Sequence, residues 1–258
     1  MPVEVVDAVA VREAVVLDGE DPCGGAPRGA DVPVTAHPDG TPRCLARLLR
    51  DAADGRFPDA DGSWVRVPPW RAGVEAVVAF TGFAVLAVDG PVPGAAAGSG
   101  IDGSGIDGFG GAHDPRLIAA LAGPDGWIDS LDALLVARGT GGPPVLRARP
   151  DLAGHPRVAF ARAVRDDVRV LGRASGDEVA VLARGIAGLT ELSMEVPPAA
   201  RGGTGRALVR DALASVPAGE VVVAACAPGN AASLRTLLAA GFVPVGSSQL
   251  FRRGSPVR

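Results

Sequence analysis

Lysine and tyrosine are absent from this 258-residue chain, and asparagine occurs once, at Asn230. Apart from three histidines, every basic side chain is an arginine, a bias that fits a GC-rich coding sequence and implies nothing about a substrate. The formal net charge of -4 argues against nucleic acid as the main partner. Cysteine is also scarce: Cys23, Cys44 and Cys226 form neither a metal-binding pattern nor a disulfide framework, so a reducing compartment is expected.

Targeting signals and membrane spans are missing as well. The first residues, MPVEVVDAVAVREAVV, lack the basic and apolar regions of a signal peptide, and no apolar run is long enough to span a bilayer. We therefore expect a cytoplasmic protein without membrane contacts. With 47% hydrophobic residues, the chain can form one large domain or two small ones.

A strand, a glycine-rich turn and a helix are predicted in succession from residue 189. The alternating run LTELSMEV (189–196) indicates a strand that Pro197 and Pro198 end. RGGTG (201–205) follows, and apolar residues at helical spacing begin directly after it. Glycines let a phosphate approach the backbone, and the free N–H groups of a helix N-terminus bind anions. The turn is a candidate anion site, with a plain connection as the alternative.

Asn230 opens a second helix close by. VVVAAC (221–226) predicts a buried strand, Pro228 and Gly229 a turn, and residues 231–240 a helix that Gly241 ends. Asn230 occupies the N-cap position, where its side-chain oxygen accepts a bond from a first-turn N–H. Its amide is also free to face a ligand that lies between the two helix starts.

These two segments resemble the GNAT superfamily of acyl-CoA-dependent N-acetyltransferases, over roughly the second half of the chain. LTELSMEV with VPPAARGGTG and GRALVRDAL is similar to the family's cofactor motif, and NAASLRTLLAAGFVPVG (230–246) to its second motif. The resemblance implies that the strands at 189–196 and 221–226 splay apart, that pantetheine lies between them, and that the pyrophosphate binds at the turn. The implied acetyl-CoA contacts are Met194, Glu195, Val196, Arg201, Gly202, Gly203, Thr204, Gly205, Arg206, Asn230 and Ser233.

Two carboxylates are candidates for the base that takes the proton of the attacking amine. Glu191 and Glu195 are four apart on the motif strand and so share one face of it. Glu195 is the preferred candidate because it is nearer the turn, whereas a solvated or arginine-paired glutamate is the alternative for each. Cys226 is interpreted as a small buried residue rather than a nucleophile, which agrees with direct transfer in the family.

Two departures from the family pattern stand out. The first position of the usual turn falls on Ala200, with Arg201 one place later. Many members carry a tyrosine that protonates the leaving thiolate, and Leu237 occupies the corresponding position here. The absent phenol makes a non-catalytic CoA-binding module a serious alternative to an enzyme.

The preceding residues are harder to interpret. We expect a helix at 41–53, a hairpin from VEAVVAF and FAVLAV (74–88), and a flexible glycine-rich loop at 94–112. A helix follows Asp114, and a strand is expected at 131–138. A helix that turns into a strand near Val168 and a strand VAVLAR come next, and a final hairpin is expected around 246–249. His37, His113 and His155 have no ligand spacing and are expected in surface loops.

The predicted architecture is therefore α/β with a mixed sheet: a GNAT-like acyl-CoA-binding domain at 131–258, and an α/β region at 1–130. That region is either a degenerate second copy of the fold or a lid over the acceptor site. The leading function is N-acetyl transfer from acetyl-CoA to a primary amine of a small molecule or peptide, by direct attack and without a metal. A homodimer remains open, as does a structural role in binding another chain.

Overall fold

The computed structural model describes residues 15–16, 43–93, 106–200 and 202–254. The expected pyrophosphate contact Arg201 and the first part of the predicted glycine-rich loop, residues 94–105, lie outside the described residues. The end of that predicted loop forms a short 3-10 helix, η2 (Gly111–His113), rather than a loop alone.

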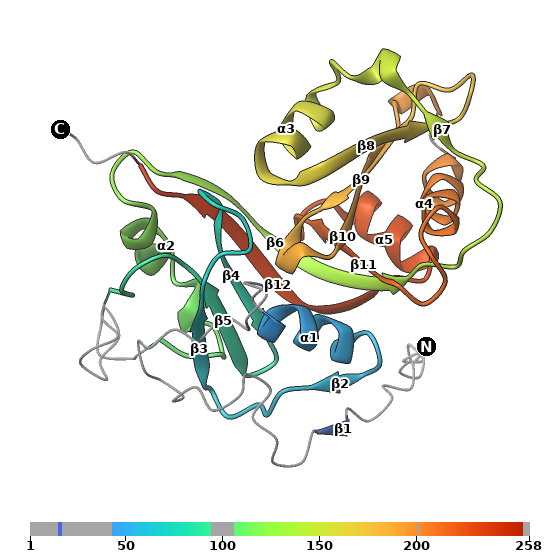
Figure 1. The fold of residues 1–258 in the computed structure, drawn as a ribbon. Helices are drawn as coiled ribbons and strands as arrows, with labels where there is room; N and C mark the ends of the chain where they lie inside the picture. The colour runs from blue at the N-terminus through green and yellow to red at the C-terminus, as the bar shows by residue number, and fades with distance from the viewer. Residues whose placement is uncertain (1–14, 17–42, 94–105, 201, 255–258) are drawn as a thin grey trace, which may run out of the picture.

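A single mixed sheet of ten strands organises the described residues, in the order β3-β5-β4-β12-β6-β11-β10-β9-β8-β7 (Figure 1). Neighbouring strands are antiparallel except for β3 with β5 and β10 with β11. The strands are β3 (Trp64–Val67), β4 (Glu75–Phe80), β5 (Phe83–Ala87), β6 (Trp127–Arg138), β7 (Arg147–Ala148), β8 (Asp166–Gly172), β9 (Val179–Arg184), β10 (Thr190–Glu195), β11 (Val221–Cys226) and β12 (Val243–Arg252). A separate parallel pair joins β1 (Val15–Val16) and β2 (Arg56–Phe57).

Five α-helices cover the two faces of this sheet, in the part of the chain that the structure describes. They are α1 (Arg43–Ala52), α2 (Pro115–Ala122), α3 (Pro156–Val164), α4 (Thr204–Ala214) and α5 (Ala231–Ala239). Three short 3-10 helices join them: η3 (Pro150–Leu152), η4 (Ile186–Gly188) and η5 (Pro198–Ala200).

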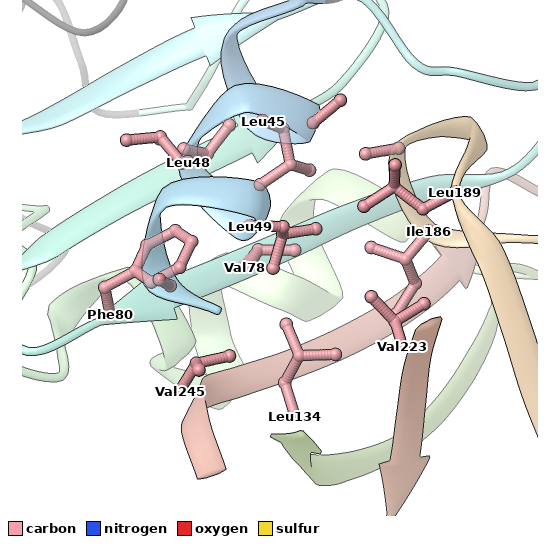
Figure 2. Packing of buried hydrophobic residues seen from close by; sticks show 14 of the residues in the cluster. Leu45, Leu48, Leu49, Val78, Phe80, Leu134, Ile186, Leu189, Val223 and Val245 are labelled. Atoms are coloured by element: carbon pink, nitrogen blue, oxygen red, sulfur yellow. The ribbon is translucent and has the colours of Figure 1, made fainter. Parts of the chain in front are cut away.

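Alternation along the strands decides which helix covers which face. Leu134 and Val136 of β6 pack with α1, whereas Leu135 and Ala137 pack with α4 and α5 on the other face. Figure 2 shows the α1 side, where Leu45, Leu48 and Leu49 meet residues of β4, β6, β11 and β12 together with Ile186 of η4. α3 covers the same face over β9, and α2 covers the opposite face over β4 and β5.

The predicted elements of the second half are confirmed with one exception. β10, α4, β11 and α5 agree with the sequence patterns to within about a residue or two, and so does the β4–β5 hairpin of the first half. The predicted hairpin around residues 246–249 is wrong, because β12 runs without a turn from Val243 to Arg252. A register shift against β6 lies between Pro244 and Gly246, where the turn was expected. A Cβ at Gly246 would lie 2.0 Å from the Ala79 carbonyl oxygen, so glycine allows the close approach of β4.

The N-terminal region contributes one edge of the same sheet. β3, β5 and β4 reach the C-terminal elements through β12, which pairs with β4 on one side and β6 on the other. The boundary expected after residue 130 falls inside β6, which begins at Trp127 rather than at Leu131. The described residues of this region do not show a second copy of the fold.

His113 departs from the expected surface position. Its Nε2 lies 3.0 Å from the Ser247 hydroxyl of β12, and its Nδ1 is buried without a hydrogen-bond partner among the described residues. Burial lowers the pKa of His113 from 6.5 to about 4. The folded protein therefore keeps this imidazole neutral at pH values where the unfolded chain protonates it.

We expect this histidine to make stability depend on pH. Between pH 6.5 and 4 the unfolded chain binds more protons than the folded one, so stability falls as the pH drops through that window. The loss reaches about 3 kcal/mol at most. Urea unfolding at several pH values measures it, and His113→Leu should flatten the curve. An equally steep curve in that variant would assign the dependence to other groups.

Candidate active site

The strands β10 and β11 separate after a short parallel contact. They pair only at Thr190 with Val222 and at Glu191 with Val223, although β10 continues to Glu195 and β11 to Cys226. The other edge of β10 stays paired with β9 as far as Glu195. The N–H and C=O groups of β10 that face β11 beyond Glu191 are therefore available to an extended ligand with amide groups.

The turn after β10 leads directly into α4. Gly203, the N-cap, has a φ of 101° and Gly202 a φ of 112°, a region that residues with a Cβ rarely adopt. No side chain caps α4 and no acidic residue lies in its first turn. The first N–H groups of this helix therefore remain free for an anion, and Arg206 lies beside them.

Asn230 caps the neighbouring helix α5 as predicted. Its side-chain oxygen accepts a hydrogen bond from the Ser233 backbone N–H at 3.1 Å. The N-terminal ends of α4 and α5 border one groove, which Gly203 and Asn230 both line. Further along α5, Thr236 faces Gly205 of α4: a Cβ at Gly205 would lie 3.2 Å from the Thr236 methyl carbon. The sequence-predicted cap is confirmed, and its amide lies at the groove.

The groove between these elements has a volume of about 1030 Å³. Most of the predicted cofactor contacts line it: Met194, Glu195, Val196, Gly202, Gly203, Gly205, Arg206, Asn230 and Ser233. Thr204 does not line it with the others and contributes the first residue of α4. Arg157, Arg235 and Thr236 also line the groove and were missed, since no local motif marks them. Two of these are arginines, which suit a ligand that carries phosphates.

A second cavity of about 410 Å³ adjoins the first, and both are lined by Arg157 and Glu195. β10 and α3 form one of its walls, and β6 with β12 form the other. The sequence-predicted candidates Glu191 and Glu195 both line this cavity, on one face of β10 as expected. The face is shared, but the two carboxylates differ in their partners.

Glu191 belongs to a buried ion pair. Its side chain is 2% exposed and accepts a hydrogen bond from Arg165 Nη2 at 2.5 Å, while its second oxygen accepts one from the Ile186 backbone N–H at 3.0 Å. Arg165 also donates to the Ser193 hydroxyl. Both oxygens of Glu191 are thus occupied, which makes it a poor acceptor for a substrate proton.

Glu195 lies at the junction of the two cavities and is 49% exposed. Arg157 Nε lies 3.3 Å from one of its oxygens, and His155 Nε2 lies 3.9 Å from the other. An exposed pair of this kind contributes little to stability. The carboxylate therefore remains accessible to a ligand from either side.

Two aspartates that no sequence pattern singled out line the second cavity from β6. Burial raises the pKa of Asp129 and of Asp132 above the usual value. Asp132 accepts a hydrogen bond from the Ser130 hydroxyl at 2.8 Å. The early start of β6 accounts for the omission of Asp129, which precedes the predicted strand at 131–138, whereas Asp132 lies inside that predicted strand and no motif marked it.

Cys226 and Leu237 lie inside the core that packs β11 against α4 and α5. Burial raises the pKa of the Cys226 thiol, so it stays protonated, in agreement with its interpretation as a small buried residue. Leu237, at the position of the family's tyrosine, contacts this core rather than the groove. A tyrosine at 237 would overpack this cluster instead of supplying a phenol.

Comparison with known proteins finds likeness at the level of structure alone. No family model and no curated protein sequence matches the chain. An acetyltransferase assigned to the GNAT family from Novosphingobium aromaticivorans matches 51% of this chain and 69% of its own, at 20% identity and a TM-score of 0.35. A Drosophila protein matches 54% and 55%, at 16% identity and a TM-score of 0.35.

A GCN5-related N-acetyltransferase from Kribbella flavida matches 54% of this chain and 63% of its own, at 17% identity and a TM-score of 0.25. GNAT-family structures thus match about half of the chain at low identity.

No helix within the described ranges is long and apolar enough to cross a membrane.

Proposed function

We propose that this chain is an acyl-CoA-dependent N-acyltransferase that uses acetyl-CoA and acts on a primary amine. The observation that carries the proposal is the separation of β10 from β11 after Glu191, just ahead of the uncapped N-terminus of α4. An open strand edge followed by an anion site suits a ligand with an extended amide arm and a pyrophosphate.

The proposed cofactor position uses the predicted residues. The pantetheine amides pair with the backbone near Met194 and Val196, and the pyrophosphate accepts from the first N–H groups of α4 and from Arg206. Asn230 and Ser233 border the groove from α5. Arg201, predicted at the same turn, remains a proposed contact.

Glu195 is the proposed base because it lines both cavities and is accessible from each. It takes a proton from the ammonium, and the amine nitrogen then attacks the thioester carbonyl carbon. The C–N bond forms, the C–S bond breaks, and the nitrogen's second proton reaches the departing thiolate directly or through water. Glu195 returns its own proton to solvent, so the chemistry requires no phenol.

Replacing Glu195 by glutamine is expected to lower turnover by about two orders of magnitude, the usual contribution of a positioned base. CoA affinity should stay within about twofold, because the groove residues that bind phosphate are untouched. Steady-state kinetics across pH measure the effect. Asp151→Asn removes a carboxylate that pairs with Arg149 away from both cavities and serves as the control. An unaltered pH–rate profile in Glu195→Gln would assign the proton transfer to another group.

The function itself is tested by two measurements on the wild-type protein. Calorimetry with CoA and acetyl-CoA reports binding, and a thiol-release assay with a broad amine panel reports transfer. A non-catalytic CoA-binding module is the second candidate, favoured by the absence of tyrosine from the chain. Tight CoA binding without thiol release in the presence of any amine would support that module, and absence of CoA binding would refute both.

A further inference from the structure

The second cavity has two walls of different electrostatic character. On the wall of β10 and α3, Glu191 pairs with Arg165 and Glu195 pairs with Arg157, so the charges cancel in both pairs. On the wall of β6 and β12, Asp129 and Asp132 form no ion pair with any described residue. Ser130 donates to both carboxylates, to Asp129 from its backbone N–H and to Asp132 from its hydroxyl. Arg165 acts electrostatically on both aspartates, but it already pairs with Glu191, so the cavity lining holds two more carboxylates than arginines.

Ser248 supplies an independent sign of a ligand at the same wall. It lies on β12 directly opposite Asp132 of β6, so the two side chains point to the same face of the sheet. Ser248 is 3% exposed and lines the cavity, yet its hydroxyl has no hydrogen-bond partner within the described residues. Because Ser248 lines the cavity, its hydroxyl can accept a hydrogen bond from a donor group of a ligand there.

We propose that Asp129, Asp132 and Ser248 bind a second, distal positive charge on the acceptor, whose reacting amine lies at Glu195. The acceptor is then a small diamine or an equivalent dication rather than a monoamine or an amino acid. This assignment rests on the proposed function for the identity of the reacting end. A distal carboxylate would meet the two aspartates and be repelled.

The dimensions of the cavity agree with such a ligand. β11 lies between β6 and β10, and strands are about 4.8 Å apart, so the two walls are separated by about 10 Å or slightly more where β10 diverges. Four methylene groups hold the nitrogens of a diamine about 6 Å apart. A charge-assisted hydrogen bond of about 2.8 Å at each nitrogen adds to this length, so the diamine and its two hydrogen bonds together span the distance between the walls. Phe160, Ile186 and Leu250 provide apolar contacts for the methylene chain.

Three amines of nearly equal length test the proposal: 1,4-diaminobutane, 1-aminopentane and 4-aminobutanoate. In 1-aminopentane a methyl group replaces the distal ammonium, and in 4-aminobutanoate a carboxylate replaces the distal CH2–ammonium group. Binding to the CoA-loaded protein is measured by calorimetry, and kcat/KM by thiol release. We expect both the affinity and kcat/KM to be about 10- to 100-fold higher for the diamine than for aminopentane. This range lies between the effect of an exposed ion pair and that of a buried one. Aminobutanoate should be the weakest.

Asp132→Asn is expected to raise Kd and KM for the diamine by about tenfold or more and to leave aminopentane almost unaffected. The kcat of Asp132→Asn at saturating diamine should change little. A higher KM with an unchanged kcat distinguishes a residue that binds the substrate from Glu195, whose replacement lowers turnover. Ser248→Ala should weaken diamine binding by a smaller factor. Asp151→Asn, with the same loss of charge outside both cavities, is the matched control.

Equal binding of the diamine and aminopentane, or unchanged diamine binding in Asp132→Asn, would overturn the proposal. So would failure of all three amines to bind wild-type protein. Failure of the proposed function has a different signature: the diamine would bind with the expected dependence on Asp132, while CoA would not bind or no thiol would be released. That result would retain the dication site and remove the transfer reaction.

Discussion

Replacing Arg165 by methionine is expected to destabilise the protein by about 3–5 kcal/mol, as is usual when one partner of a buried ion pair is removed. Glu191 would be left with its charge in a nearly inaccessible site, since its side chain is 2% exposed. The Ile186 N–H would become its only remaining hydrogen-bond donor among the described residues. The Ser193 hydroxyl would lose its bond from Arg165 as well.

Urea unfolding measures this loss of stability, and two further variants test whether the unpaired charge of Glu191 causes it. Arg157→Met breaks the exposed pair with Glu195 and should cost less than about 1 kcal/mol. The double variant Arg165→Met with Glu191→Leu removes both charges and should recover most of the stability. A loss below about 1 kcal/mol for Arg165→Met alone would mean that water reaches the pair.

Gly205→Val is expected to lower the affinity for CoA by about two orders of magnitude, which corresponds to the loss of one or two charge-assisted hydrogen bonds. A Cβ at this position already lies 3.2 Å from the Thr236 methyl carbon, and a branched side chain extends further. It must either push α5 away from α4 or enter the groove at the first turn of α4. In both cases the proposed pyrophosphate position is obstructed.

Calorimetry with CoA measures this effect, and circular dichroism checks that the variant is folded. Gly154→Val is a suitable control, because a Cβ there meets no atom within 4 Å and Gly154 has no positive φ. Gly203→Ala separates backbone strain from obstruction, since its Cβ would meet open space while its φ of 101° disfavours any side chain. A folded Gly205→Val protein with unchanged CoA affinity would contradict the site assignment.

The parts of the site that local signals determine were predictable. Pro197 and Pro198 end β10, glycines mark the turn, and Asn230 caps α5 where the sequence indicates a cap. Each of these signals acts over a few residues. They are sufficient to locate the groove and most of its lining residues.

Side chains that distant segments bring together were not predictable. Arg157 and Arg165 reach the cavity because α3 packs over β9, and Asp132 reaches it because β6 pairs with β12. Sequence alternation places Glu191 and Glu195 on one face of β10 but does not reveal that only Glu191 meets a buried arginine. Gly246 resembles a turn residue, although tertiary contact with β4 makes it part of a continuous strand.

The position of β12 has a consequence for how the protein reaches its folded state. This strand, the last element of the described chain, lies between β4 and β6 in the middle of the sheet. Until residues 243–252 leave the ribosome, β4 and β6 each expose an unpaired edge, and such edges favour intermolecular association. Pairing of residues about 170 positions apart is also slow, because loop closure precedes the contacts that stabilise it. The sheet is therefore expected to assemble only after β12 has been synthesised, and until then the chain depends on protection of those edges.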